Sequence, residues 1–465
     1  MKNTMNLFNK IIDGMHGQLC IMHYALCIAV TGMLLGCTFE QEDYFDESAS
    51  LRITHMNEQI KDRLVAQSSD GNYGWVIQYF VSGTDDYNFE GFNLFGRFYD
   101  DNKVTLASDH RFLRNGNANK YTEYTSNYEM LAEEGPVLSF NTWNDILTVF
   151  EDPVDPSKAP NSLADNGEGM HGDHNLVLSS FEDNCLTFHG ERHGARVRFI
   201  PCDRPWQEYI DDTNKLKDFI SSGTYSDFYV VGPKGDTLYF KNVRNGIITY
   251  CERLEDPLFP STINCVFSPN GFRLHHENEI NGTKFQEFRM AADSTCLLSA
   301  DDSVKVMGCW DNNFVNDVNK AKNKLWAIDP ATLNATQKAA YDGILADMNG
   351  LEVKGIGLYS YSGTSGSLSL EFLSGGKSVF ASIQLGVMKT SYGRVELSYN
   401  SAAKANSNLT NLGKKNKREN VEPLMRELAA SLVGTYELTP DNYFLPTAMT
   451  LKQEDGTAIY KLNNK

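Results

Sequence analysis

Positive charge is scarce in this sequence. Its 465 residues include 42 Lys and Arg against 60 Asp and Glu, which gives a formal net charge of −18 at pH 7. An acidic chain repels the phosphates of nucleic acid, so the composition argues against a nucleic-acid partner. The same excess of negative charge favours solubility.

Long apolar runs are missing downstream of residue 36. The stretch from Gln18 to Gly36 has no charged residue and follows the basic Lys2 and Lys10. A charged start, an apolar stretch and a small residue before a cleavage point are typical of a secretory signal. A bilayer-spanning helix needs about 20 apolar residues, and this stretch only just reaches that length while containing polar residues. We therefore predict an exported chain and exclude a multi-pass membrane protein.

Cys37 is the predicted attachment point to a membrane. Leu34-Leu35-Gly36-Cys37 resembles a lipobox. The resemblance implies that residues 1–36 are a lipoprotein signal peptide and that Cys37 becomes a lipidated N-terminus, which palmitate would label. A lipid anchor of more than one chain holds a domain to a membrane without a spanning helix.

Residues 37–50 form a predicted acidic tether. Half of the ten residues that follow Cys37 are Asp or Glu. This composition resembles the export signal that directs Bacteroidota lipoproteins to the outer face of the outer membrane. A solvated tether explains the same charges, because charge-rich segments stay disordered. Both interpretations can hold together, and we expect an outer-membrane lipoprotein that faces the cell exterior.

Hydrolase motifs are missing as well. The chain contains neither a G-x-S-x-G elbow nor an H-E-x-x-H helix. We therefore expect binding rather than catalysis. Two alternatives stay open: an exported hydrolase whose active site carries no known motif, and a structural or adhesive envelope protein.

Hydrophobic periodicity predicts an α+β fold that is mostly β. Met56, Ile60 and Leu64 recur at a spacing of four, as on one face of a helix. Short β-like segments punctuated by Gly, Asn and Asp follow, which is typical of an antiparallel meander. The pattern predicts two or three packed units of β-meander, each preceded by a short helix. The predicted helices are Leu51 to Gln67, Trp206 to Ile220, Asn334 to Met348 and Val421 to Leu432.

The same pattern divides the body into three predicted regions. Residues 51–204 hold the first helix and meander, 205–328 the second, and 329–465 the C-terminal helix with one or more β units. Residues 401–420 are polar and basic, and we interpret them as an exposed loop.

Six cysteines belong to the predicted mature body: Cys185, Cys202, Cys251, Cys265, Cys296 and Cys309. An exported chain permits disulfides. A hairpin turn at His193-Gly194 would place Cys185 opposite Cys202, close enough for a bridge. Cys296 and Cys309 would close a similar hairpin. The alternative of six buried free thiols is preferred, since the Cys-dense spacing of small disulfide domains is missing.

Histidines cluster in one region. His171, His174 and His189 lie close together in the sequence, and Asp173 lies between the first two. His is a common metal ligand and Asp can complete a site. A divalent metal is therefore one hypothesis for these four residues. An exposed polar loop without any cofactor is the preferred one, because the spacing matches no defined zinc motif.

Several structural motifs together resemble a known family. They are Gly74-Trp75, the strand from Asn93 to Phe98, Tyr128, the segment from Gly135 to Asn144, Asp152-Pro153, Gly172-Asp173 and the strand from Leu186 to Gly190. This set resembles the domain of unknown function 4302 family of Bacteroidota lipoproteins, from about Asp46 to the C-terminus.

The family resemblance implies an accessory role at the cell surface. Some members are encoded near outer-membrane nutrient-uptake pairs, so the expected partners are a transporter complex and a glycan or peptide ligand. The resemblance supplies no catalytic residue. His171 and His174 depart from it, because a Gly and an aromatic residue are expected at those positions.

Overall fold

The structure is a computed structural model that describes residues 47–82, 89–152, 169–221, 228–241, 243, 246–251, 261–308, 325–362, 365–391 and 393–464. The predicted signal peptide, Cys37 and most of the predicted tether lie outside the described residues. None of the described helices is both long and apolar enough to cross a membrane. Residues 56–465 form one compact unit.

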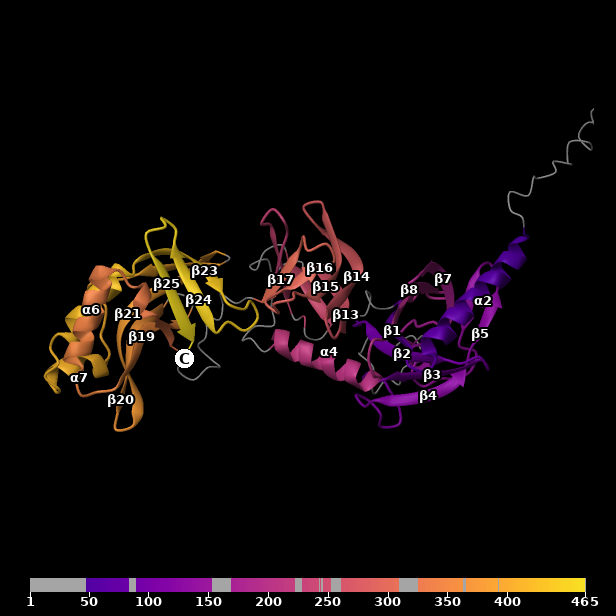
Figure 1. Ribbon diagram of the computed structural model, residues 1–465, viewed down its shortest axis with the longest axis horizontal. Helices are drawn as coiled ribbons and strands as arrows, with labels where there is room; N and C mark the ends of the chain where they lie inside the picture. Colours follow the sequence, from indigo (N-terminus) through magenta and orange to yellow (C-terminus); the bar gives the residue numbers. More distant parts are fainter. Residues whose placement is uncertain are drawn as a thin grey trace, which may run out of the picture. The chain divides into compact units, whose positions relative to one another are not determined.

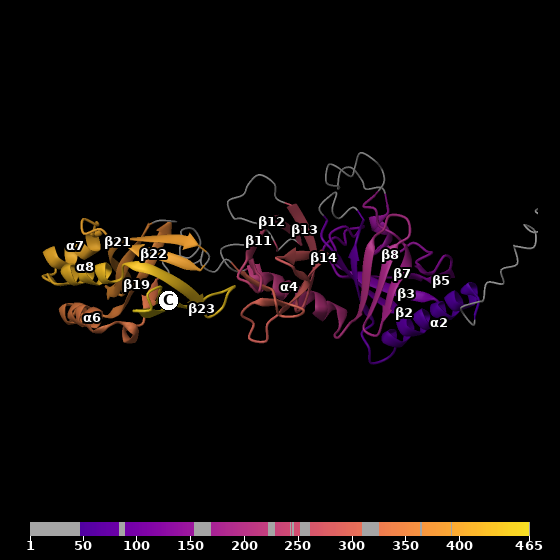
Figure 2. The ribbon, with the colours of Figure 1, turned by 90° about the horizontal axis from the view of Figure 1, so that it is seen from above.

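Antiparallel β-structure dominates this unit, which confirms the predicted α+β, mostly β class. Three sheets occur in sequence order, and Figures 1 and 2 show their strands along the colour gradient. The first sheet has nine strands, and the other two are closed eight-stranded barrels.

The nine-stranded sheet has the order β4-β3-β2-β1-β9-β8-β7-β6-β5. Its strands are β1 (Trp75–Phe80), β2 (Phe92–Phe98), β3 (Lys103–Ser108), β4 (Thr122–Asn127), β5 (Glu129–Ala132), β6 (Pro136–Ser139), β7 (Asn175–Glu182), β8 (Cys185–Gly190) and β9 (Arg196–Pro201). The edge strands β4 and β5 are consecutive in the chain, with only Tyr128 between them. The sheet must therefore curl until its two edges meet at Tyr128.

Helix α2 (Ala49–Ser68) packs against this curled sheet, as Figure 1 shows. The predicted apolar stripe is confirmed, since Ile60 and Leu64 are fully buried. The Trp75 indole N–H donates to the Leu64 carbonyl oxygen at 3.1 Å. The helix thus fills the core beneath β1.

Helix α4 (Trp206–Ser221) joins the sheet to the first barrel. Its first turns pack on the outer face of the sheet, where the Trp206 and Tyr209 rings lie 5.8 and 5.4 Å from the Phe95 ring. The barrel strands are β10 (Phe228–Val231), β11 (Thr237–Lys241), β12 (Ile247–Cys251), β13 (Ser261–Ser268), β14 (Gly271–Ile280), β15 (Thr283–Met290), β16 (Leu297–Ser299) and β17 (Lys305–Gly308). The later part of α4 packs on β13.

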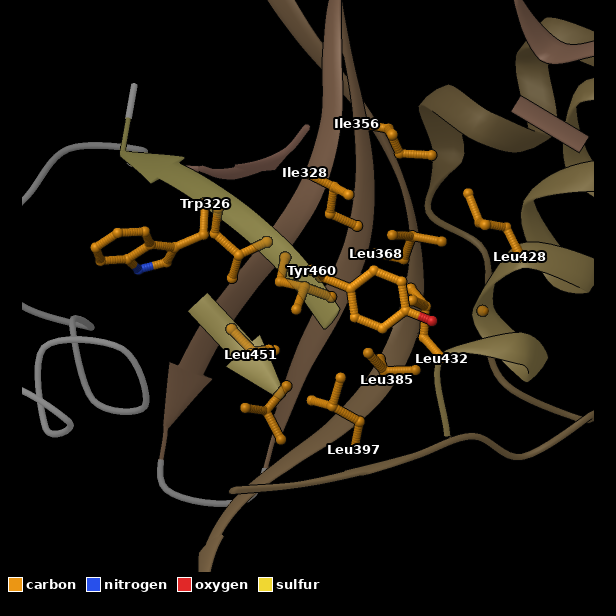
Figure 3. Close-up of a cluster of buried hydrophobic side chains, with 14 of the residues drawn as sticks. Trp326, Ile328, Ile356, Leu368, Leu385, Leu397, Leu428, Leu432, Leu451 and Tyr460 are labelled. Carbon is orange, nitrogen blue, oxygen red and sulfur yellow. The ribbon is translucent and has the colours of Figure 1, made fainter. Parts of the chain in front are cut away.

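The second barrel encloses the largest apolar core, and Figure 3 shows Leu368, Leu385 and Tyr460 in it. Its strands are β18 (Trp326–Ile328), β19 (Val353–Ser362), β20 (Ser365–Ser374), β21 (Lys377–Ser391), β22 (Arg394–Ser398), β23 (Gly434–Pro440), β24 (Ala448–Gln453) and β25 (Ile459–Asn464). Helices α6 (Ala335–Asp347), α7 (Ser407–Lys414) and α8 (Val421–Ser431) accompany it.

Helix α7 corrects the prediction that residues 401–420 are an exposed loop. The Asn406 side chain caps the helix by accepting from the Leu409 backbone N–H. Leu409 and Leu412 are buried, at a spacing of three. The basic residues around them concealed this short apolar face in the sequence.

Phe444, in the segment between β23 and β24, is buried in the core of the first barrel. Its ring lies 5.7 Å from Phe228 and 5.9 Å from Phe219. The neighbouring Tyr443 backbone N–H donates to the Thr295 carbonyl oxygen at 3.1 Å. One aromatic side chain thus ties the segment of the second barrel to the first.

Candidate functional site

Asp173, the central residue of the predicted metal cluster, caps the turn between β8 and β9. Its carboxylate accepts the backbone N–H groups of Arg192, His193 and Ala195 at 2.9 to 3.0 Å. The Tyr79 hydroxyl donates to the Asp173 carbonyl oxygen and accepts from its N–H. Because Asp173 is only 3% exposed, these bonds satisfy a buried charge.

The three predicted histidine ligands lie at the same end of the β7–β8 hairpin, but each has its own partner. The His171 ring stacks on His193 at 5.2 Å. His174 Nδ1 lies 2.7 Å from a Glu151 carboxylate oxygen, and this hydrogen bond raises the pKa of His174. His189 Nδ1 lies 2.8 Å from the Ser179 hydroxyl.

The predicted metal site gains no geometric support from these positions. No three His, Cys, Asp or Glu side chains of the described residues are placed to hold a metal ion. His171 has a φ of +57°, in the left-handed region that favours glycine. This backbone explains why the family resemblance leads one to expect a glycine there.

The hypothesis of a Cys185–Cys202 disulfide is wrong for this structure, where both thiols are free and buried. Strands β8 and β9 pair with Leu186 opposite Phe199. This register would place Cys185 opposite Ile200, two residues short of Cys202. The prediction placed the turn correctly, but the pairing register does not bring the two cysteines together.

Free thiols are found wherever a cysteine side chain is described, at Cys185, Cys202, Cys265 and Cys296. Cys309 and the side chain of Cys251 lie outside the described residues, so the suggested Cys296–Cys309 pair is not tested by them. Burial raises the pKa of Cys202 to about 11. This thiol therefore stays protonated and unreactive at neutral pH.

A cleft of about 540 Å³ lies where the nine-stranded sheet, α4 and the first barrel meet. Its walls come from residues 90–93 at the start of β2, 108–111 after β3, one face of α4, and β12–β13. Ligand pockets usually have volumes of about 300–1,000 Å³, so this one suits a small molecule.

Close backbone packing holds the cleft together. The Gly91 N–H donates to the Cys265 carbonyl oxygen at 3.1 Å, and the Asn93 side-chain amide donates to the Phe267 carbonyl oxygen at 2.7 Å. A β-carbon at Gly91 would lie 2.8 Å from the Val266 β-carbon. Only glycine permits this approach of sheet and barrel.

Charged side chains of both signs line the cleft. Arg111 forms an ion pair with Glu90 at 2.6 Å. The Lys217 ammonium lies 5.2 Å from the centre of the Phe267 ring. Burial raises the pKa of Asp109, and the positive charge of Lys217 opposes that rise. The formal charges of the two acidic and two basic side chains in the lining therefore sum to zero.

Hydrogen-bond acceptors without donors accompany these charges. Asn93 Oδ1 and His110 Nδ1 are buried and have no partner among the described residues. His110 Nε2 must donate to the Ile146 carbonyl oxygen, 3.0 Å away, which leaves Nδ1 as the bare acceptor. Burial lowers the pKa of His110 to about 4, so the ring is neutral at pH 7. The Asp109 carboxylate accepts a hydrogen bond from its own backbone N–H, and no described side chain donates to it.

Exposed aromatic rings lie outside the cleft. Phe92 and Phe267, which line it, are almost fully buried. Trp143 is 46% exposed and Tyr124 37% exposed. The Asn144 amide, next to Trp143, donates to the Tyr124 carbonyl oxygen at 3.4 Å. Neither of these two rings lines the cleft.

Sequence reasoning did not predict the cleft residues. Glu90, Asp109 and Lys217 come from three distant segments, and none belongs to a recognisable motif. The one available signal was Gly91, because a residue without a side chain allows two backbone segments, here those of the sheet and the first barrel, to approach closely.

Comparisons with known proteins identify a family and little else. A family model described as a domain of unknown function (DUF4302) matches residues 41–292. This range confirms the resemblance, covers every cleft residue, and ends within the first barrel rather than at the C-terminus. The comparison with curated proteins finds no match.

One solved structure shares limited likeness, the crystal structure of the beta subunit from DNA polymerase of Streptococcus pyogenes. It has 9% identity over 88% of this chain and 98% of that chain, with a TM-score of 0.13. A score this low carries no argument about fold or function.

Proposed function

We propose that this chain, which belongs to the DUF4302 family, is a surface lipoprotein that binds a small polar nutrient molecule, a glycan or peptide. In this proposal it serves as an accessory to an outer-membrane transporter. The observation that carries it is the cleft of about 540 Å³ with its balanced charges and unpaired acceptors.

The location rests on the N-terminal sequence. The lipobox-like Leu34 to Cys37 and the acidic residues after it support a lipid anchor and export to the outer face of a Bacteroidota outer membrane. A protein held there meets extracellular nutrients before they reach a transporter, which is where an accessory binder acts.

The binding role rests on the polar lining of the cleft. A pocket that fixes a small molecule needs a few convergent polar groups beside apolar surface. Here Asp109, Lys217 and the Glu90–Arg111 pair supply the polar groups, and Phe92 and Phe267 the apolar backing. Asp109 is half-buried and, among the described residues, accepts only from its own backbone N–H, so a ligand that donates to it would offset part of the free-energy cost of its burial.

A hydrolase is the second candidate, and one observation favours it. The raised pKa of Asp109 is the property of a general acid. Glu90, the other carboxylate, is already held by Arg111, so a paired base is not positioned. Product formation from any bound ligand would favour the hydrolase.

Isothermal titration calorimetry, in which a glycan or peptide ligand is titrated into matched lysine variants of the protein, tests the binding role. Lys217→Met alters the cleft, while Lys215→Met changes the same helix at an exposed position that pairs with Asp212 outside the cleft. Loss of one charge-assisted hydrogen bond, about 1.5–3 kcal/mol, should weaken binding roughly 10- to 100-fold in Lys217→Met alone. Equal affinities in both variants would place the binding surface elsewhere.

Surface display needs its own test. Protease added to intact cells should remove the protein from the wild type, whereas the Cys37→Ala chain should be released from the membrane fraction. A wild-type protein that is fully protected in intact cells would contradict the outward-facing location.

A further inference from the structure

We propose that the ligand of the cleft is electrically neutral and rich in hydroxyl groups, as a short saccharide is. This inference rests on the proposed binding function and names its ligand class. It excludes phosphorylated compounds, acidic sugars, polyamines and peptides as the preferred occupants.

Charge balance is the first step. The carboxylates of Glu90 and Asp109 face the cationic groups of Arg111 and Lys217 within one lining. An anionic ligand would gain no net attraction here, and it would also approach a chain of net charge −18. A polyamine would meet two cationic groups already in place. A neutral ligand avoids both penalties.

The direction of the missing hydrogen bonds is the second step. Asn93 Oδ1 and His110 Nδ1, the unpaired buried atoms of the described lining, are acceptors, and the Asp109 carboxylate accepts only from its own backbone N–H. Neutral imidazole offers one acceptor nitrogen, and a carboxylate accepts only. Of these acceptors, the half-exposed Asp109 carboxylate is the one that a ligand reaches. The ligand must therefore supply a donor to it, which an ionised phosphate or carboxylate lacks.

Donor density separates saccharides from peptides. A hydroxyl group both donates and accepts at a single oxygen, so a sugar ring carries several donors over a short span. A peptide backbone offers one N–H donor per residue, spaced about 3.3 Å apart when extended. The carboxylates and the cationic groups that line one small cleft are met more readily by the hydroxyls of a sugar, which donate and accept at short spacing.

Glu90 and Arg111 complete the match, because their ion pair presents both acceptor and donor atoms at the rim. Such a pair can exchange hydrogen bonds with adjacent hydroxyls without a change in net charge. Its side chains are 22% and 45% exposed, respectively, so a ligand can reach them.

The test is calorimetric titration of the full-length lipidated protein in a detergent without a sugar head group. Probes of similar size are neutral trisaccharides of glucose and mannose, trigalacturonic acid, trialanine, spermidine and inorganic phosphate. We expect at least one neutral trisaccharide to bind at least 10-fold more tightly than every charged probe. Its affinity should change less than twofold between 50 and 500 mM NaCl, because a neutral ligand has no charge to screen.

Two variants tie the result to the cleft. Asp109→Leu removes the acceptor and should weaken trisaccharide binding at least 10-fold, whereas Asp109→Asn keeps one acceptor oxygen and should retain more of it. Lys215→Met is the control. A heat-unfolding midpoint equal to wild type identifies variants that are folded.

The outcomes separate the two proposals. Preferential binding of trialanine or of a charged probe, lost in Lys217→Met, would overturn the saccharide inference and leave the binding function standing. A trisaccharide that binds equally well to Asp109→Leu would also overturn it. Binding of no probe at all would overturn both.

Discussion

Replacing Asp173 with alanine should destabilise the nine-stranded sheet without affecting any metal. The carboxylate accepts three backbone N–H groups at 2.9 to 3.0 Å in the turn between β8 and β9. Alanine leaves those donors without this partner, the Ala195 N–H in a buried setting and the other two in partly buried ones. The substitution also removes the close contact between the Asp173 carboxylate and Gly190. A β-carbon added at Gly190 would lie only 1.8 Å from Asp173 Oδ2.

The expected magnitude follows from these bonds. Hydrogen bonds to charged groups contribute about 1.5–3 kcal/mol each, but bonds within one network do not add fully. We expect a loss of about 4 kcal/mol in the free energy of unfolding. For a domain of 150–250 residues this lowers Tm by roughly 8–16 °C. Asp173→Asn keeps one acceptor oxygen and should lose about half as much.

Differential scanning calorimetry with and without EDTA distinguishes the capping role from a metal site. The structural role predicts the same Tm loss in both conditions, and no effect of EDTA on the wild type. Asp183→Asn, an exposed change in the neighbouring β7–β8 turn, should shift Tm by less than about 2 °C. A wild-type Tm that falls on chelation, or an Asp173→Ala shift as small as that of Asp183→Asn, would refute the reasoning.

Three further predictions concern separate parts of the chain. The pKa of His110 is about 4 in the folded protein, below its unfolded value of about 6.5. Its contribution to stability is therefore complete above pH 6.5 and is lost as pH falls towards 4, by about 3 kcal/mol. In urea unfolding across this range, the free energy of unfolding of His110→Gln should depend less on pH than that of the wild type. The same pH dependence in both proteins would contradict this prediction. Phe444→Ala should lower the free energy of unfolding in urea by about 3–5 kcal/mol, because the Phe444 ring is 2% exposed. Leu445 is 39% exposed, so Leu445→Ala should lower it by less than about 0.5 kcal/mol. Similar losses in the two variants would contradict the burial of Phe444. Radiolabelled palmitate should label the wild type and fail to label Cys37→Ala, and labelling of both would overturn the anchor.

Sequence patterns located α2, α4, α6 and α8 closely but missed α7, since each of the four has an apolar stripe that can be read without its partners. The helix predicted from Trp206 to Ile220 is α4, Trp206–Ser221. The one expected from Val421 to Leu432 is α8, Val421–Ser431. Periodicity is a property of one segment, which is why it survives in the sequence alone.

The edge strands were not predicted, because their conformation depends on neighbouring strands and not on a pattern within one segment. Strand β4 consists of Thr, Glu, Tyr, Thr, Ser and Asn, and only Ser126 is buried. Its strand conformation comes from pairing with β3, not from its own apolar pattern. Context of this kind decides β-structure more than intrinsic preference does.

The sequence by itself determined the class of the fold and the resemblance to one family, because both rest on local patterns; the export signal before Cys37 stays a prediction from the sequence. Tertiary structure alone decided the roles of individual side chains. It shows that Asp173, a candidate metal ligand from the sequence, caps a turn, and a two-residue register separates Cys185 from Cys202. It also gathered Glu90, Asp109 and Lys217 into one cleft, because a site built from distant segments exists only once the sheet, α4 and the barrel have packed.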